Sequence, residues 1–252
     1  MKREDRQQAI MNLLVAQGAV DLDDLASRFA VSRMTIHRDL DDLETAGLLR
    51  KIRGGATIEA GTRFESDFRY RERQGGTTKA RMAQTALDLI EPGMTVLIND
   101  GSTAAALGRA LVAKRPLTVI TNNAAILDAL RDETGVTLIA LGGVYSPKYN
   151  AYFGKLTEDA LANLRADLVF ISTPALADGA AFHPEESVIA TKRAMMRAGG
   201  QVWLMVNHAR FGHSALHKLA NLSAFDGLIT DTAPEGFDPD GLPLLTPKED
   251  IA

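Results

Sequence analysis

Apolar residues recur at helical spacing in three successive stretches of the first 45 residues. In chain order these positions are Ile10, Leu13 and Leu14, then Leu22, Leu25, Ala26 and Phe29, then Ile36, Leu40 and Leu43. Each set falls on one face of a helix, because residues three and four apart are neighbours on a helix surface. The pattern therefore predicts three amphipathic helices in close succession.

The residues between these helices are of the types that begin and end helices. Gly18 follows the first predicted helix, and glycine is the usual residue just past a helix end. Asp21 and Ser32 precede the second and third helices, where a side-chain oxygen accepts hydrogen bonds from the first turn. Gly47 ends the third helix. The second and third helices, joined by a tight turn, are typical of a helix-turn-helix.

The third helix leaves polar side chains on or beside its outer surface. A recognition helix places such residues, near its N-terminus, against base edges and phosphates of DNA. Residues 48–57 follow and predict a two-stranded wing that turns near Gly54 and Gly55, with basic side chains available for phosphates. The candidate DNA-binding residues are Ser32, Arg33, Thr35, His37, Arg38, Arg50, Lys51 and Arg53.

A three-helix structural module with solvated charges is the alternative for this segment. The basic residues between positions 33 and 53 are offset by acids, so bulk charge decides little. The bases, however, lie at the start of the third helix and in the wing, whereas the acids cluster later on that helix, a distribution that favours DNA contact. The acids are Asp39, Asp41, Asp42 and Glu44.

Length and composition limit the class of protein. With 252 residues and a formal net charge of −4, the chain has room for two domains and any DNA contact has to be local. The absence of cysteine rules out disulfides and thiolate metal sites. No apolar run reaches the ~18 residues of a membrane span, and Asn12 and Gln17 interrupt the one segment that faintly resembles a signal peptide. We expect a cytoplasmic protein without a membrane partner.

Residues 59–77 are highly charged and hold few apolar positions. Such a composition is typical of an exposed linker, with a short helix expected over residues 64–73. The sequence therefore predicts a winged helix-turn-helix domain over residues 1–58, a linker over 59–77 and a larger domain over 78–252.

Short apolar runs alternate with helical stretches in the larger domain. The expected strands lie at residues 94–98, 117–120, 136–141, 168–171, 202–206 and 228–229, and the expected helices at 79–90, 103–113, 123–131 and 186–198. This alternation predicts a Rossmann-like α/β domain with a largely parallel sheet.

Polar or glycine-rich loops follow three successive strands of this predicted sheet. Ligands of such sheets bind at the carboxyl ends of the strands, where loops lead into helix N-termini that suit an anion. The three loops together predict a shared phosphate or sugar pocket, although glycine and serine also form ordinary turns. Their residues are Asp100, Gly101, Ser102 and Thr103, then Thr121 and Asn122, then Gly142 and Gly143.

Two parts of the sequence resemble the DeoR family of bacterial transcriptional regulators. In the N-terminal part the matching residues are Val31-Ser-Arg-Met-Thr-Ile-His-Arg-Asp-Leu40, Leu43, Gly47, Leu48 and Arg53-Gly-Gly-Ala56. The larger domain is similar to the sensor domain of the family at Lys79, Asp100-Gly-Ser-Thr103, Thr121-Asn122, Gly142-Gly143, Gly154, Glu185 or Glu186, Lys192-Arg-Ala-Met195, Asn207-His-Ala-Arg-Phe-Gly212 and Thr230-Asp231.

The resemblance implies a sensor domain with a fold similar to ribose-5-phosphate isomerase, which detects a phosphorylated sugar or polyol. It also implies a repressor, rather than an activator, of a carbohydrate or polyol catabolic operon, with no cofactor. Residues 100–103 would hold the phosphate, the other two loops would line the pocket, and Arg210 would supply a cation. Glu185 and Lys192 complete the implied effector site. Paired half-sites on DNA further predict a homo-oligomer, a dimer or a tetramer.

Three positions depart from the family pattern. His37-Arg38 stands where two consecutive arginines are usual. The histidine would change base preference, or weaken binding above neutral pH if the imidazole has to be charged. Asn207 replaces an aspartate, and residues 171–175 replace a stretch that often contains glycine. An atypical effector is one consequence of the last two changes.

Three other functions remain as alternatives. A sugar-phosphate isomerase would need a carboxylate base and a cation, with Asp100, Asp178 or Glu185 as the base and Lys192 or Arg210 as the cation; a DNA-binding module would be an odd companion for it. A metal site at His213 and His217, four residues apart on a possible helix near His208, lacks a completing carboxylate. An interaction module that does not bind DNA is the third, and the expectation is that the chain is not an enzyme and binds no metal.

Overall fold

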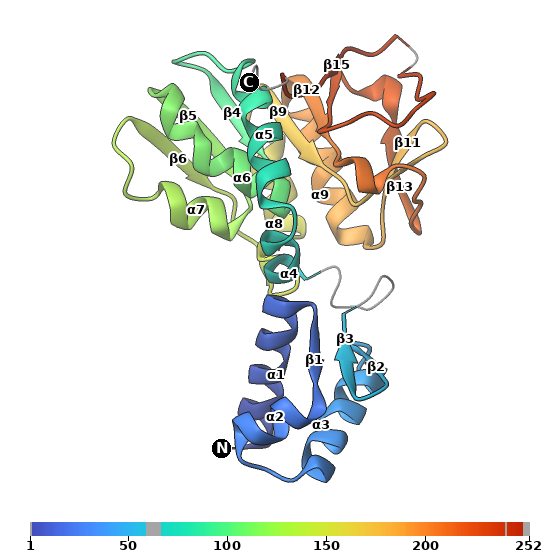
Figure 1. The fold of residues 1–252 in the computed structure, drawn as a ribbon. Coiled ribbons are helices and arrows are strands. Elements are labelled where there is room, and N and C mark those ends of the chain that lie inside the picture. The colour runs from blue at the N-terminus through green and yellow to red at the C-terminus, as the bar shows by residue number, and fades with distance from the viewer. Residues whose placement is uncertain (1, 59–66, 240, 249–252) are drawn as a thin grey trace. The chain divides into compact units, whose positions relative to one another are not determined.

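The computed structural model describes residues 2–58, 67–239 and 241–248 (Figure 1). Contacts within the chain divide it into two compact units, Met1–Gln74 and Gly75–Ala252. These are called the N-terminal unit and the α/β unit below, and each is described by itself.

The N-terminal unit contains the three helices that the apolar pattern predicts. They are α1 (Arg3–Gln17), α2 (Leu22–Phe29) and α3 (Arg33–Thr45), and a short α4 (Phe68–Arg73) contacts α1. Gly18 ends α1 with a φ of +79° and donates its N–H to the Leu14 carbonyl. The Asp21 carboxylate accepts hydrogen bonds from the first turn of α2. The predicted caps are therefore confirmed, and Ile10, Leu25, Ile36 and Leu40 meet in one buried core.

The wing has one strand more than the sequence predicts. Strands β2 (Arg50–Ile52) and β3 (Gly55–Thr57) form the expected antiparallel hairpin, and β1 (Ala19–Asp21) pairs with the other side of β3. The third strand has only three residues between the end of α1 and the cap of α2, too few for a period-two pattern to appear. It attaches the wing to the helices.

Replacing Gly55 with alanine is expected to destabilise the N-terminal unit by about 1–3 kcal/mol. A Cβ atom on Gly55 would lie 2.0 Å from the backbone carbonyl oxygen of Val20 on β1, and backbone cannot move aside as a side chain can. Hydrogen exchange of peptides from residues 18–58 should increase. Gly76→Ala is the matched control, because a Cβ there meets nothing within 4 Å. Equal exchange in the two variants would contradict the prediction.

A seven-stranded parallel sheet forms the centre of the α/β unit. Its strands lie in the order β15-β14-β12-β9-β4-β5-β6. Their bounds are β4 (Thr95–Ile98), β5 (Leu117–Thr121), β6 (Val136–Ala140), β9 (Ala166–Ser172), β12 (Gly199–Met205), β14 (Gly227–Ile229) and β15 (Leu244–Leu245). The order is that of a doubly wound sheet, because the chain starts in the centre, runs to one edge and returns to build the other half. The predicted Rossmann-like class is confirmed.

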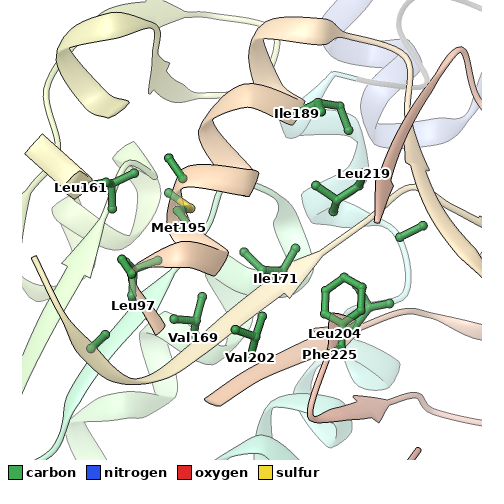
Figure 2. Packing of buried hydrophobic residues seen from close by; sticks show 14 of the residues in the cluster. Leu97, Leu161, Val169, Ile171, Ile189, Met195, Val202, Leu204, Leu219 and Phe225 are labelled. Carbon is green, nitrogen blue, oxygen red and sulfur yellow. The ribbon is translucent and has the colours of Figure 1, made fainter. Parts of the chain in front are cut away.

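The helices of this unit lie close to their predicted positions. They are α5 (Gly76–Leu87), α6 (Ser102–Ala110) with the 3₁₀ turn η1 (Leu111–Lys114), α7 (Ala124–Leu130), α8 (Lys155–Ala162) and α9 (Glu186–Arg197). Figure 2 shows Met195 of α9 in the apolar core with Val169 and Ile171 of β9. The helix α8 was not predicted.

Short antiparallel segments complete the α/β unit, and the sequence predicts none of them. A hairpin pairs β7 (Val144–Ser146) with β8 (Ala151–Phe153), and a second sheet has the order β10-β11-β13. Its strands are β10 (Ala175–Ala177), β11 (Ala180–His183) and β13 (His217–Asn221), and the 3₁₀ turns η2 (His208–Arg210) and η3 (Leu222–Ala224) flank β13. Among the described residues, no helix is long and apolar enough to cross a membrane.

Candidate functional site

The helix α3 separates its buried and exposed side chains as the apolar spacing predicts. Ile36 and Leu40 are fully buried, whereas His37 and Arg38 are exposed. Arg38 forms no ion pair or hydrogen bond with another residue that the structure describes. Its guanidinium is therefore available to an external anion, and His37 lies beside it on the same surface.

Three other candidate residues of α3 have partners inside the N-terminal unit. The Ser32 hydroxyl caps α3 by accepting the Thr35 N–H at 3.2 Å, and the two hydroxyl oxygens lie 2.9 Å apart. The Arg33 guanidinium forms an ion pair with Asp23 of α2 at 2.9 Å. Both side chains of this pair are well exposed, so solvent screens the pair and the arginine can exchange it for a phosphate.

Two of the four acids of α3, Asp39 and Asp42, pair with arginines of α1 and not with the bases of α3 and the wing. Asp39 is buried, and the Arg6 guanidinium of α1 donates to its two oxygens at 2.5 and 3.2 Å. This hydrogen bond raises the pKa of Arg6 above its usual value. Asp42 forms an ion pair with Arg3. These acids bind α1 to α3, which reduces the negative charge that they add to the exposed surface.

The basic residues of the wing differ in their surroundings. Lys51 forms an ion pair with Asp41 of α3, and its backbone N–H donates to Glu44 at 2.7 Å, so this residue attaches the wing to α3. Arg50 and Arg53 are exposed on either side of it. By exposure alone, Arg50 and Arg53 are more accessible to solvent than the half-buried Lys51.

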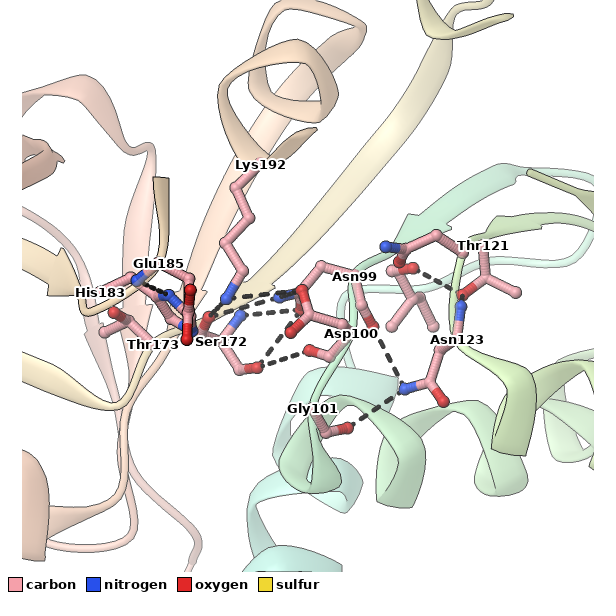
Figure 3. A network of polar contacts seen from close by, with 12 residues as sticks. Asn99, Asp100, Gly101, Thr121, Asn123, Ser172, Thr173, His183, Glu185 and Lys192 are labelled. Carbon is pink, nitrogen blue, oxygen red and sulfur yellow. Dashed lines mark hydrogen bonds and ion pairs between the residues drawn. The ribbon is translucent and has the colours of Figure 1, made fainter. Parts of the chain in front are cut away.

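In the α/β unit, polar residues gather where the strand order reverses. The first strand of this sheet along the chain, β4, lies beside β9, and doubly wound sheets bind ligands in the crevice at such a switch point. Asn99 follows β4, and its side-chain oxygen accepts the Ser172 N–H from β9 at 2.9 Å. The Ser172 hydroxyl donates to the Asp100 carbonyl at 3.0 Å. These bonds fix the two loops against each other (Figure 3).

Lys192 and Asp100 place opposite charges at this switch point. Lys192, on α9, donates to the Ser172 carbonyl at 2.8 Å, and its Nζ lies 3.6 Å from Asp100 Oδ1. Both residues are buried, with 2% and 1% of their surface exposed. Two buried charges are stable only when they compensate each other or bind polar groups. The pair is a polar centre that the strand ends hold in place.

The loop after β5 joins the same group of residues. The Thr121 hydroxyl donates to the Ile98 carbonyl at 2.7 Å, and the Asn123 amide donates to the Gly101 carbonyl at 3.2 Å. The Asn122 amide donates to the Tyr152 carbonyl at 2.8 Å, while its Oδ1 is buried and has no hydrogen-bond partner among the residues that the structure describes. The structure thus brings together the predicted loops after β4 and β5.

The N-terminus of α6 lies beside this network. Gly101, at the N-cap, has a φ of +109° and no side chain that could cap the helix. Ser102 is nearly buried and Thr103 is half-buried in the first turn. A helix N-terminus without a side-chain cap presents backbone N–H groups to an anion.

The predicted glycine loop after β6 has a structural role. A Cβ on Gly143 would lie 2.4 Å from the Thr157 hydroxyl and 2.6 Å from the Phe153 carbonyl, and the Gly142 carbonyl accepts a hydrogen bond from Thr157 at 2.7 Å. The pair therefore allows α8 to approach the loop closely. Directly before the pair, the Leu141 N–H donates to the carbonyl of Thr121 at 2.9 Å, which attaches this loop to the end of β5.

Two further predicted residues lie elsewhere in the α/β unit. Glu185 occupies the N-cap position of α9 without a side-chain capping bond, and the Lys148 ammonium at 2.9 Å holds the pKa of its carboxyl below the usual value. Arg210 lies in η2, in the segment that follows β12, and is half-buried.

Asn207, which stands where the family pattern has an aspartate, can still cap the segment that follows it. Its side-chain oxygen accepts the Ala209 N–H at 2.9 Å and so caps η2, as a carboxylate would. A carboxylate is still nearby, because Asp231 accepts the His208 N–H at 2.7 Å and pairs with the His208 ring.

Sequence reasoning missed several residues of the network. They are Asn99, Asn123, Ser172, Thr173 and His183. For the first four, the available signal was their position within three residues after a predicted strand. His183 ends β11, a strand that the sequence does not predict, so it offered no such signal. The shared helix expected for His213 and His217 is wrong, because His217 begins β13. In the described ranges, no group of three or more potential ligand residues could hold a metal ion.

Models of known protein families match both units. A sequence model of the DeoR-like helix-turn-helix domain matches residues 6–61, and one of the DeoR C terminal sensor domain matches residues 75–232. The winged helix-turn-helix and its α/β partner define a DNA-binding transcriptional regulator. The chain belongs to the DeoR family.

Curated relatives align along nearly the whole chain. The HTH-type transcriptional regulator YgbI of Escherichia coli is 30% identical over 95% of this chain and 91% of its own. The glycerol-3-phosphate regulon repressor of Escherichia coli is 28% identical over 93% of both chains. The L-fucose operon activator of Haemophilus influenzae is 31% identical over 98% of this chain and 97% of its own.

Solved structures include ribose 5-phosphate isomerase A from Methanocaldococcus jannaschii, with a TM-score of 0.40, 14% identity and 55% of each chain covered.

Proposed function

We propose that this chain is a repressor of a carbohydrate or polyol catabolic operon and that its α/β unit binds a phosphorylated sugar or polyol. The observation that carries the proposal is the Asp100–Lys192 pair, which lies at the switch point of the sheet beside the N-terminus of α6, a helix start without a side-chain cap. The names of two relatives, a glycerol-3-phosphate regulon repressor and an L-fucose operon activator, fit this class of effector.

The phosphate is proposed to bind at the start of α6. Backbone N–H groups of the first turn and the hydroxyls of Ser102 and Thr103 would donate to its oxygens, and Gly101 would let it approach the backbone. Arg210 remains the proposed additional cation, since a guanidinium can bind a phosphate through two parallel hydrogen bonds. Gly142, Gly143 and Glu185 remain proposed pocket residues with less support, because each has a structural partner.

The hydroxyl groups of the effector are proposed to bind the charged pair. A carboxylate accepts hydrogen bonds and an ammonium donates them. Asp100 can therefore accept the hydrogen of an effector hydroxyl while Lys192 donates to the oxygen of the same group. Their separation of 3.6 Å is longer than a direct N–H···O bond. Asn122 and Thr121 shape the neighbouring floor of the site.

Repression is proposed to require a homo-oligomer on paired half-sites. A dimer places two copies of α3 one helical turn of DNA apart, and effector binding would change their spacing or orientation until they no longer match. Location in the cytoplasm belongs to the same proposal. A chain that stays monomeric on its DNA in light scattering would contradict this mechanism.

A screen of phosphorylated sugars and polyols is expected to find one that raises the melting temperature of the full-length chain. At roughly 100 times its Kd the increase should be about 5–10 °C, because a ligand that binds only the folded form stabilises it by mass action. Differential scanning fluorimetry measures the shift. The same sugars without phosphate, and inorganic phosphate alone, are the controls.

The effector identified in this way should also release the chain from DNA in a gel-shift assay. The change Ser102→Ala should reduce the thermal shift while DNA binding without effector is retained. A full set of phosphorylated sugars and polyols without any shift would contradict the proposed effector class. An undiminished shift in the variant would instead contradict the proposed position of the phosphate.

A further inference from the structure

Met34 is a large apolar side chain that α3 leaves in solvent. It is the second residue of the helix and 61% exposed, and the helical spacing turns it away from the buried Ile36 and Leu40. A single exposed methionine needs no explanation on an ordinary surface. Here, however, it lies in the first turn of the helix that would enter the major groove, one turn before the exposed Arg38.

The polar side chains that flank Met34 are held by other residues of the N-terminal unit. Ser32 and Thr35 contact each other across the cap at 2.9 Å, and Arg33 is turned toward Asp23. Met34 is therefore the large apolar side chain that this first turn exposes, beside polar side chains that already have partners. An apolar side chain of this kind gains free energy by contact with another apolar group and gains little from a phosphate.

We propose that Met34 recognises a thymine of the operator by packing against its 5-methyl group. This methyl is the apolar group that base pairs present in the major groove, where the other distinguishing groups are hydrogen-bond donors and acceptors. The thioether is unbranched and polarisable, so it can adapt to a small convex group. The inference rests on the proposed docking of α3 and adds a residue that determines base preference.

A thymine-to-deoxyuridine exchange tests the contact, because it removes the methyl group and leaves every hydrogen bond of the base pair unchanged. The probe is a duplex selected from a random library by the full-length chain. Removal of the contacted methyl should weaken binding about fourfold at one base pair of each half-site. In the Met34→Ala variant the same exchange should have almost no effect, and Met34→Leu should restore most of it.

The control is Leu216→Ala, which truncates an even more exposed apolar residue, 82% accessible, in the α/β unit. In this variant, the thymine-to-deoxyuridine exchange should still weaken binding about fourfold. If each deoxyuridine penalty is the same in Met34→Ala as in the unchanged chain, the inference is wrong, while the docking of α3 is judged separately by Arg38→Ala. If the library yields no enriched sequence, both the docking and the inference fail.

Discussion

Replacing Arg38 with alanine should weaken binding to the selected duplex by about 10- to 100-fold. Arg38 is exposed near the N-terminal end of α3 and has no partner among the described residues, so its guanidinium can bind a guanine edge or a phosphate without first breaking a contact. Fluorescence anisotropy at several salt concentrations measures the loss. If Arg38 binds a phosphate, the slope of the logarithm of the binding constant against the logarithm of the salt concentration should also decrease by about one. If it binds a base, this slope should change little.

Arg197→Ala is the matched control, because it removes the same charge from an exposed position at the end of α9 in the α/β unit. It should leave both the affinity and the slope almost unchanged. An equal loss in the two variants would mean that net charge alone matters, and α3 would then not be the recognition helix. Unchanged binding in Arg38→Ala would contradict the docking directly.

The helices of the N-terminal unit and their caps could be predicted from sequence because they depend on neighbouring residues. Asp21, Ser32 and Gly18 act on the backbone within three or four residues, and their caps are as expected. The pairing of Asp39 with Arg6 was not predictable in this way. It joins residues 33 positions apart, and the buried acid resembles its exposed neighbours in sequence. The charge balance of the surface therefore needed the fold.

In the α/β unit, too, the sequence predicts the features that depend on local composition and not those that depend on the fold. Buried parallel strands are nearly continuous apolar runs, so β4, β5 and β9 could be located from composition. The hairpin β7–β8 is short and partly exposed, and its apolar residues at positions 144 and 145 face solvent instead of a core. Such strands carry little periodic signal and depend on tertiary pairing for their structure.

The candidate effector site was predictable only where it follows a strand. Asp100 and Thr121 stand at strand ends, and parallel strands bring their carboxyl ends to one edge of the sheet. Ser172 also ends a strand, but its part in the network depends on the adjacency of β4 and β9, which lie about 70 residues apart. Strand order is a property of the whole fold, and local patterns do not determine it.

Replacing Lys192 with methionine should destabilise the α/β unit by about 3–5 kcal/mol. The substitution keeps the length of the side chain but leaves the Asp100 carboxylate buried without its cation, and the Ser172 carbonyl loses a donor at 2.8 Å. The loss of one member of a buried pair costs more than the pair contributes, because the remaining charge stays desolvated. Trp203 is the one tryptophan of the sequence and lies on β12, so its fluorescence during urea unfolding reports this unit.

The double variant Asp100→Asn with Lys192→Met separates charge from packing. It removes both charges at nearly constant volume and should regain a large part of the lost stability, whereas Asp100→Asn alone should leave a buried ammonium and be destabilised. Equal losses in the single and double variants would mean that the side chains act through packing, not as a charge pair. If the double variant folds and binds the selected duplex but no longer responds to the effector, the charged pair serves recognition. Its desolvation is then a cost in stability that the fold retains because the effector needs both a donor and an acceptor at this point of the sheet.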